Sequence, residues 1–138
     1  MEAKVVWKRN LAFTGTADSG YVMDLDSKKE SGGDESGFRP TELIAIGVAG
    51  CTAMDVISIL QKKRQEVSAF EVLVHAIRAS EHPRKFTEML IEYIISGKGI
   101  DPQAVERAVE LSEEKYCSAI ATLRGNVKIA HKIVIFEV

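Results

Sequence analysis

The sequence predicts a mixed α+β fold, formed by a single domain over residues 1–138. Alternating apolar and polar residues, which are typical of strands, occur at the start, in the middle and at the end of the chain. Two helical patterns lie between them without regular strand–helix alternation, which gives the order β-β-β-α-β-β-α-β. A chain of 138 residues has the length of one domain and can bury about two-thirds of its unfolded surface.

Three short strands are predicted first, over residues 3–7, 11–16 and 21–26. Asn10 and the cluster at 18–20 supply turn residues between them. The segment 27–37 that follows is polar and rich in glycine, so we expect a mobile surface loop. It is too short to separate two domains.

A long helix is predicted from Pro40 to about residues 62–65. Proline suits the first helical position, Glu42 suits the positive end of the helix dipole, and a basic cluster suits the other end. The helix is apolar around most of its circumference as far as Ile57, so we expect it inside the protein or inside an oligomer. Its longest apolar run, 43–54, is too short to span a bilayer.

The second half of the chain predicts two strands, a capped helix and a final strand. The strands cover 70–79 and 86–96, and Asp101 followed by Pro102 is a well-formed helix start. This helix reaches Tyr116, and Cys117 lies at its end or at the start of a short helix over 118–123. The last strand is expected over 127–138.

The bulk composition excludes several functions. A net charge of −2 provides no basic field for nucleic acid or an anionic membrane, so neither is an expected partner. No secretory signal is recognisable, so we expect a cytoplasmic protein. The histidines His75, His82 and His131 show no ligand spacing, and no phosphate-binding loop occurs, so no metal or cofactor is predicted.

The two cysteines, Cys51 and Cys117, are the strongest candidates for chemistry. In a reducing compartment such a pair is more often catalytic or redox-sensing than structural. A reactive thiolate needs a nearby cation or helix N-terminus. Arg39 precedes the long helix and lies three residues from Glu42, so a guanidinium held by a carboxylate could stabilise the Cys51 thiolate. The alternative is that Arg39 and Glu42 form a surface pair at the helix entrance.

Two further features of the long helix concern its cysteine. Asp55 lies one helical turn after Cys51 and could be a buried polar partner or an ordinary helix residue. Gly47 and Gly50 each lower helix propensity, which suggests that another backbone approaches this face closely.

The stretch from Pro40 to Asp55 and the later Glu-Lys-Tyr-Cys-Ser around Cys117 resemble the osmotically inducible protein C and organic hydroperoxide resistance (OsmC/Ohr) family, in a less characterised branch. The resemblance covers nearly the whole chain. It implies an OsmC-like fold with antiparallel sheets around a long central cysteine-bearing helix, in two chains that intertwine as a homodimer.

The same resemblance implies thiol-dependent reduction of organic hydroperoxides, and less well of hydrogen peroxide, without metal or cofactor. Cys51 matches the cysteine that attacks peroxide and Cys117 the one that resolves the product, which an external dithiol then reduces. The family's glutamate directly follows the proline, where this chain has Thr41, and Glu42 is rotated from it by about 100°. The family's arginine comes from the N-terminal strands, where Arg9 is the candidate beside Arg39.

The sequence leaves three functions to compare. A cytosolic, homodimeric cysteine peroxidase is favoured, with Cys51, Cys117 and Glu42 at its site beside Arg39 or Arg9. A non-catalytic protein of the same fold that binds small molecules or senses redox state is the alternative, supported by the missing glutamate. A purely structural fold with both cysteines in the core is the third.

Overall fold

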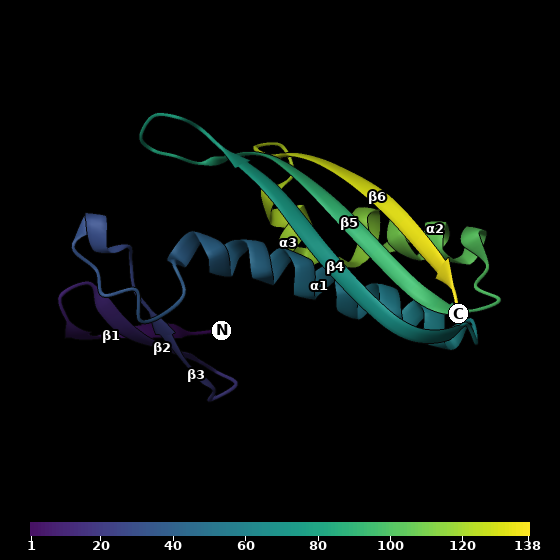
Figure 1. The fold of residues 1–138 in the computed structure, drawn as a ribbon, viewed down its shortest axis with the longest axis horizontal. Helices are drawn as coiled ribbons and strands as arrows, with labels where there is room; N and C mark the ends of the chain where they lie inside the picture. Colours follow the sequence, from purple (N-terminus) through teal and green to yellow (C-terminus); the bar gives the residue numbers. More distant parts are fainter. The chain divides into compact units, whose positions relative to one another are not determined.

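The computed structural model describes residues 1–138, which divide into two compact units, Met1–Ile44 and Ala45–Val138. The mixed α+β fold and the predicted order of strands and helices are confirmed (Figure 1). Single helical turns are added at η1 (Lys29–Ser31) and η2 (Ser112–Tyr116). The expectation that the whole chain is one domain stays a prediction.

The first unit contains an antiparallel three-stranded sheet. Its strands are β1 (Ala3–Arg9), β2 (Ala12–Ala17) and β3 (Val22–Leu25), in the order β1-β2-β3. Asn10 has a φ of 43° and Gly20 a φ of 84°, so the two turns use the left-handed backbone that these residue types tolerate. The predicted strands and turns are therefore confirmed.

The loop after β3 is folded around the carboxylate of Asp26, which is 2% exposed. This carboxylate accepts a hydrogen bond from the Ser36 hydroxyl at 2.6 Å. It also accepts bonds from the backbone N–H groups of Ser27, Asp34 and Ser36. The Ser36 hydroxyl and these N–H groups outweigh the cost of burial and lower the pKa of Asp26 to about 2. The sequence predicts a mobile loop over residues 27–37. In the structure, hydrogen bonds to the buried Asp26 carboxylate organise this loop.

The second unit contains a three-stranded sheet in the order β4-β5-β6. Strands β4 (Glu66–Arg78) and β5 (Phe86–Lys98) are antiparallel, while β6 (Lys128–Glu137) pairs with β5 in parallel. The expectation of purely antiparallel sheets is wrong for this sheet. The reason is the long crossover through α2 (Pro102–Leu111), η2 and α3 (Ser118–Leu123), which returns the chain to the same end of the sheet.

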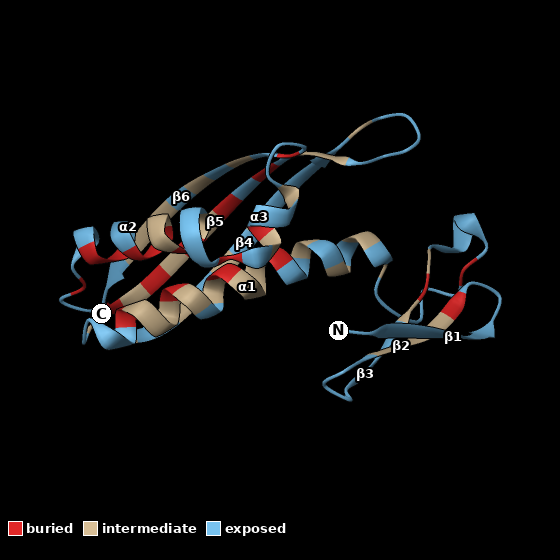
Figure 2. Ribbon diagram, turned by 180° about the vertical axis from the view of Figure 1, so that it is seen from behind, coloured by how far each residue is buried: buried red, intermediate tan, exposed pale blue.

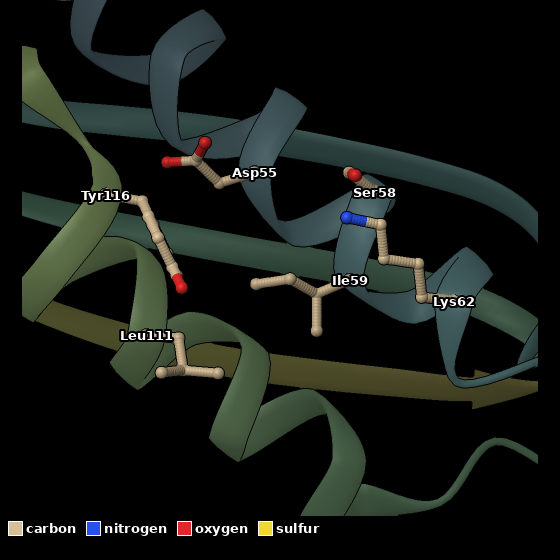
Figure 3. Close-up of a pocket in the computed structure, with 6 residues that line it drawn as sticks. All are labelled: Asp55, Ser58, Ile59, Lys62, Leu111 and Tyr116. Atoms are coloured by element: carbon tan, nitrogen blue, oxygen red, sulfur yellow. The ribbon is translucent and has the colours of Figure 1, made fainter.

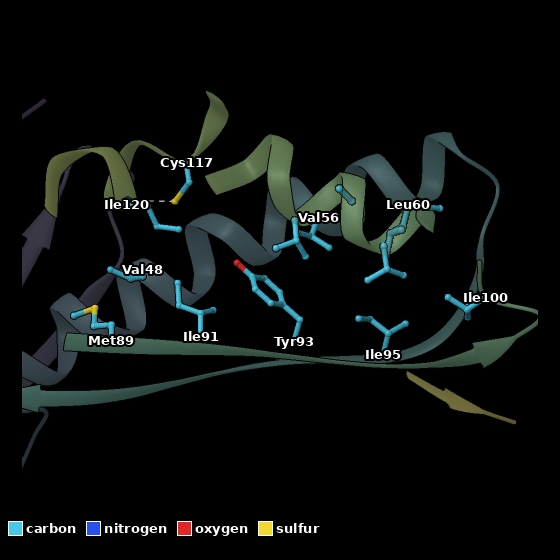
Figure 4. Packing of buried hydrophobic residues seen from close by; sticks show 14 of the residues in the cluster. Val48, Val56, Leu60, Met89, Ile91, Tyr93, Ile95, Ile100, Cys117 and Ile120 are labelled. Carbon is cyan, nitrogen blue, oxygen red and sulfur yellow. Dashed lines mark hydrogen bonds between the residues drawn. The ribbon is translucent and has the colours of Figure 1, made fainter. Parts of the chain in front are cut away.

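Helix α1 (Pro40–Lys62) begins at the predicted proline and provides the core of the second unit. Its buried residues recur every four positions, and the apolar ones pack into the same cluster as the inward residues of β5 (Figures 2 and 4). The helix contributes Val48, Thr52, Val56 and Leu60, and the strand contributes Met89, Ile91, Tyr93 and Ile95. This two-element contact is what fixes the position of Cys51.

The opposite face of α1 is open to solvent, since Ile46 is 49% exposed and Met54 is 73% exposed. The helix therefore does not lie inside a single chain, and its burial in an oligomer stays a prediction. An 18-residue window of α1 has a mean hydropathy of 2.1, so the helix is long and apolar enough to cross a bilayer, contrary to the expectation from its shorter apolar run. Its buried stripe identifies it as a core helix.

Helix α2 begins as predicted. The Asp101 carboxylate accepts a hydrogen bond from the backbone N–H of Gln103 at 3.0 Å, and Pro102 follows it. The buried side of the helix consists of Ala104, Val105, Ala108 and Val109. Because α2 packs against the core through these four residues, the turn that follows it, η2, lies next to α1.

Candidate active site

Cys51 and Cys117 both lie in the second unit but in different surroundings. Cys51 is on α1, directly before the fully buried Thr52, and it packs against the edge of the core with part of its surface exposed. Cys117 follows η2 and is 2% exposed. The sequence therefore places one thiol where a solute can reach it and the other inside the protein.

Hydrogen bonds hold Cys117 at the junction of η2 and α3. Its backbone N–H donates to the carbonyl of Ser112 at 2.8 Å, closing the wide turn of η2. Its Sγ accepts from the backbone N–H of Ile120 at 3.4 Å and so caps α3 (Figure 4). The prediction that Cys117 stands between one helix and a short second one is confirmed.

The two thiols are neighbours, although they are 66 residues apart in the sequence (117 − 51). Burial is the largest of the causes that raise the pKa of Cys117 to about 11; the Cys51 thiol adds to it, and the Ile120 N–H opposes it in part. Because the Cys51 side chain perturbs Cys117 and both residues pack into the same core cluster, the fold brings the two thiols close together. Cys117 is thus a protonated thiol at neutral pH.

The predicted charged residues lie in the first unit and pair with one another. Glu42 accepts a hydrogen bond from the backbone N–H of Arg39 at 2.8 Å, and its carboxylate lies 3.7 Å from the Arg39 guanidinium. The Arg9 guanidinium lies 3.5 Å from the carboxylate of Asp34. The structure therefore brings Arg39 and Glu42 together and gives Arg9 another partner. Their roles at the thiol stay predictions.

A buried network of hydroxyl groups, which the sequence does not predict as a unit, lies beside the cysteines. The Thr52 hydroxyl is 2.8 Å from the Tyr93 hydroxyl and 2.7 Å from that of Ser112, and all three residues are fully buried. Ser112 donates to the carboxylate of Asp55 at 2.9 Å, and Asp55 is half-buried. A role for Asp55 as the polar partner of Cys51 stays a prediction. The only signal in the sequence is a few polar residues within otherwise apolar stripes.

The other end of this network reaches a histidine on β6. Tyr93 donates to Glu113 at 3.1 Å, and Glu113 lies 2.9 Å from Nδ1 of His131. Glu106 lies 3.6 Å from Nε2 of the same ring. Burial opposes the charged imidazole, but Glu113 and Glu106 outweigh it and raise the pKa of His131. We define the hydroxyl network as Asp55, Ser112, Thr52, Tyr93 and Glu113.

A surface cavity of about 370 Å³ lies between α1 and the end of α2 (Figure 3). It is lined by Asp55, Ser58, Ile59, Lys62, Leu111 and Tyr116. Neither cysteine lines it, but Asp55 joins it to the hydroxyl network. The cavity is therefore an entry to that network rather than to the thiols.

Comparison with known proteins gives consistent results. A family model described as OsmC-like protein matches residues 32–132. The protein YhfA of Escherichia coli strain K12 is 40% identical over 131 residues, which cover 95% of each chain. A crystal structure of a hypothetical protein from Aquifex aeolicus VF5 is 30% identical with a TM-score of 0.80 and covers 97% of this chain and 96% of its own.

A more distant structure shows the same fold. The organic hydroperoxide resistance protein OhrB of Bacillus subtilis is 22% identical, with a TM-score of 0.61, and the match covers 96% of this chain and 98% of that one.

Proposed function

The chain belongs to the OsmC-like family, and from this premise we propose that it is a cytoplasmic, thiol-dependent peroxidase that reduces organic hydroperoxides, and hydrogen peroxide less well. The observation that carries the proposal is the proximity of two thiols that are remote in sequence and pack into the same core cluster. Two adjacent thiols of unequal exposure are the components of a peroxide-reducing site. The fold shared with an organic hydroperoxide resistance protein supports the substrate class.

The reaction uses both sulfur atoms in turn. The Cys51 thiolate attacks the terminal oxygen of the hydroperoxide, an S–O bond forms as the O–O bond breaks, and the alkoxide takes a proton to leave as an alcohol. The product is a sulfenic acid on Cys51. The Cys117 sulfur then attacks the Cys51 sulfur, the S–O bond breaks, and the hydroxyl leaves with the Cys117 proton as water. An external dithiol reduces the resulting disulfide back to two thiols.

The burial of the two residues supports this division of roles. Cys117 is 2% exposed and its pKa is raised to about 11, so it is a poor target for peroxide in solution. Cys51 keeps part of its surface exposed. Cys51 is accordingly the residue that meets the substrate, and Cys117 is the residue that resolves the sulfenic acid.

Stabilisation of the Cys51 thiolate is assigned to an arginine, either Arg39 with Glu42 or Arg9. Arg39 and Glu42 already form a pair, which is the arrangement that fixes a guanidinium in one orientation. Arg9 has Asp34 in the equivalent role.

A second copy of the chain is the expected partner of α1. In the second unit, a Cβ atom built on Gly47 or Gly50 meets no other atom within 4 Å, so a second backbone could approach there. Ile46 and Met54, both exposed, provide apolar surface on the open side of the helix. We therefore include a homodimer in the proposal.

The proposal is tested by the consumption of cumene hydroperoxide with dithiothreitol as reductant. We expect turnover to disappear in Cys51→Ser, because no other thiol is accessible, and Ser118→Ala, an exposed residue beside the second cysteine, serves as the control that keeps it. Turnover that survives the Cys51 substitution would contradict the assignment.

One observation favours the alternative, a non-catalytic protein of this family that binds a small molecule or senses redox state. Glu42 is occupied at the helix entrance by the Arg39 backbone and side chain, and Thr41 holds the position next to the proline. Under this alternative the purified protein would consume peroxide no faster than free cysteine does.

A further inference from the structure

The hydroxyl network lies in the core next to both cysteines, and the peroxide chemistry described above does not use it. Thr52, Tyr93 and Ser112 are each completely buried, and together they link α1, β5 and η2. Two carboxylates end the network, Asp55 on one side and Glu113 on the other. A buried polar network of this kind is costly unless its members are satisfied, so its position beside the site requires an explanation.

Ser112 is the member that contacts both cysteine segments. Its carbonyl accepts the backbone N–H of Cys117 at 2.8 Å. Its hydroxyl lies 2.7 Å from that of Thr52, the residue that directly follows Cys51. Ser112 also begins the π-helical turn η2, a type of distortion that is frequent at functional sites. Ser112 thus links the backbone of Cys117 to Thr52, the residue next to Cys51.

We propose that Ser112 is a positioning residue which, through Thr52 and Tyr93, holds the Cys117 turn against the Cys51 helix so that the two sulfurs can form a disulfide. The role of Ser112 in catalysis rests on the proposed function. Its effect on disulfide formation between Cys51 and Cys117 does not depend on that function. The condensation forms an S–S bond of about 2.05 Å, breaks the S–O bond and releases water. A displacement of the turn by about 1 Å would therefore slow this step strongly.

The test measures how readily the two thiols pair in glutathione redox buffers, without any peroxide. Thr52→Val removes the central hydroxyl at nearly constant volume, and Thr52→Ser keeps it. We expect Thr52→Val to lower the equilibrium constant for the Cys51–Cys117 disulfide about tenfold relative to Thr52→Ser, because it removes two buried hydrogen bonds.

Two further variants complete the test, one as a substitute for Thr52→Val and one as a control. Tyr93→Phe removes a hydroxyl but keeps the ring, so it repeats the test if Thr52→Val does not fold. Thr87→Val removes a hydroxyl that donates to the carbonyl of Ile77 near the start of β5, outside the network, and should change nothing. Equal disulfide constants in Thr52→Val and Thr52→Ser would overturn the positioning role. If the glutathione result holds while peroxide leaves Cys51 unoxidised, the positioning role stands and the peroxidase proposal fails.

Discussion

Cys117 is nearly closed to solvent and Cys51 is not, and this difference supports the roles that we propose for them. Burial is the largest cause of the raised pKa of Cys117, and the Cys51 thiol adds to it. A thiol with that pKa is mostly protonated at neutral pH and is a weak nucleophile toward solutes. At the scale of single residues, this supports the proposal that Cys117 reacts after Cys51 has been oxidised.

His131 gives a pH dependence at the same scale. Its pKa is raised in the folded protein, so the stability it contributes is present below its unfolded pKa of about 6.5 and is lost as the pH rises through the folded value. We expect the free energy of unfolding in urea to decrease as the pH rises above about 6.5.

His131→Gln should flatten this decrease, while His82→Gln, in an exposed loop, should preserve it. A decrease of the same size in both variants would show that another group is responsible.

At the scale of helices and strands, the sequence predicted those features that depend on neighbouring residues. Pro40 and the Asp101–Pro102 pair start their helices where expected, because caps and proline act within one turn. The parallel pairing of β6 with β5 was not predicted, because it depends on the path of a crossover of many residues. The hydroxyl network was missed for the same reason, since its members come from three separate elements.

The cap of α2 can be tested directly, because this helix carries η2 and Cys117 at its end. Asp101→Ala removes the carboxylate that accepts from Gln103, and we expect a loss of about 1 kcal/mol in the free energy of unfolding. Asp101→Asn retains an accepting oxygen and is the matched control. Denaturant titration measures both, and an alanine variant as stable as the asparagine variant would contradict the capping role.

At the scale of the whole molecule, the second unit explains how two distant cysteines meet. The long crossover between β5 and β6 passes back over α1, and the packing of α2 against the core places η2 beside the buried stripe of that helix. Sequence motifs indicated which cysteines to compare, but their proximity follows from this topology. The exposed side of α1 is the surface that we expect a second copy of the chain to cover.

The central claim is that the two thiols form one redox site, and mass spectrometry after one equivalent of cumene hydroperoxide tests it most directly. We predict a single intramolecular disulfide between Cys51 and Cys117, and in Cys117→Ser a sulfenic acid on Cys51 that proceeds to sulfinic acid with excess peroxide. Cys51 that is over-oxidised in the unmodified protein, with Cys117 left as a free thiol, would contradict the account.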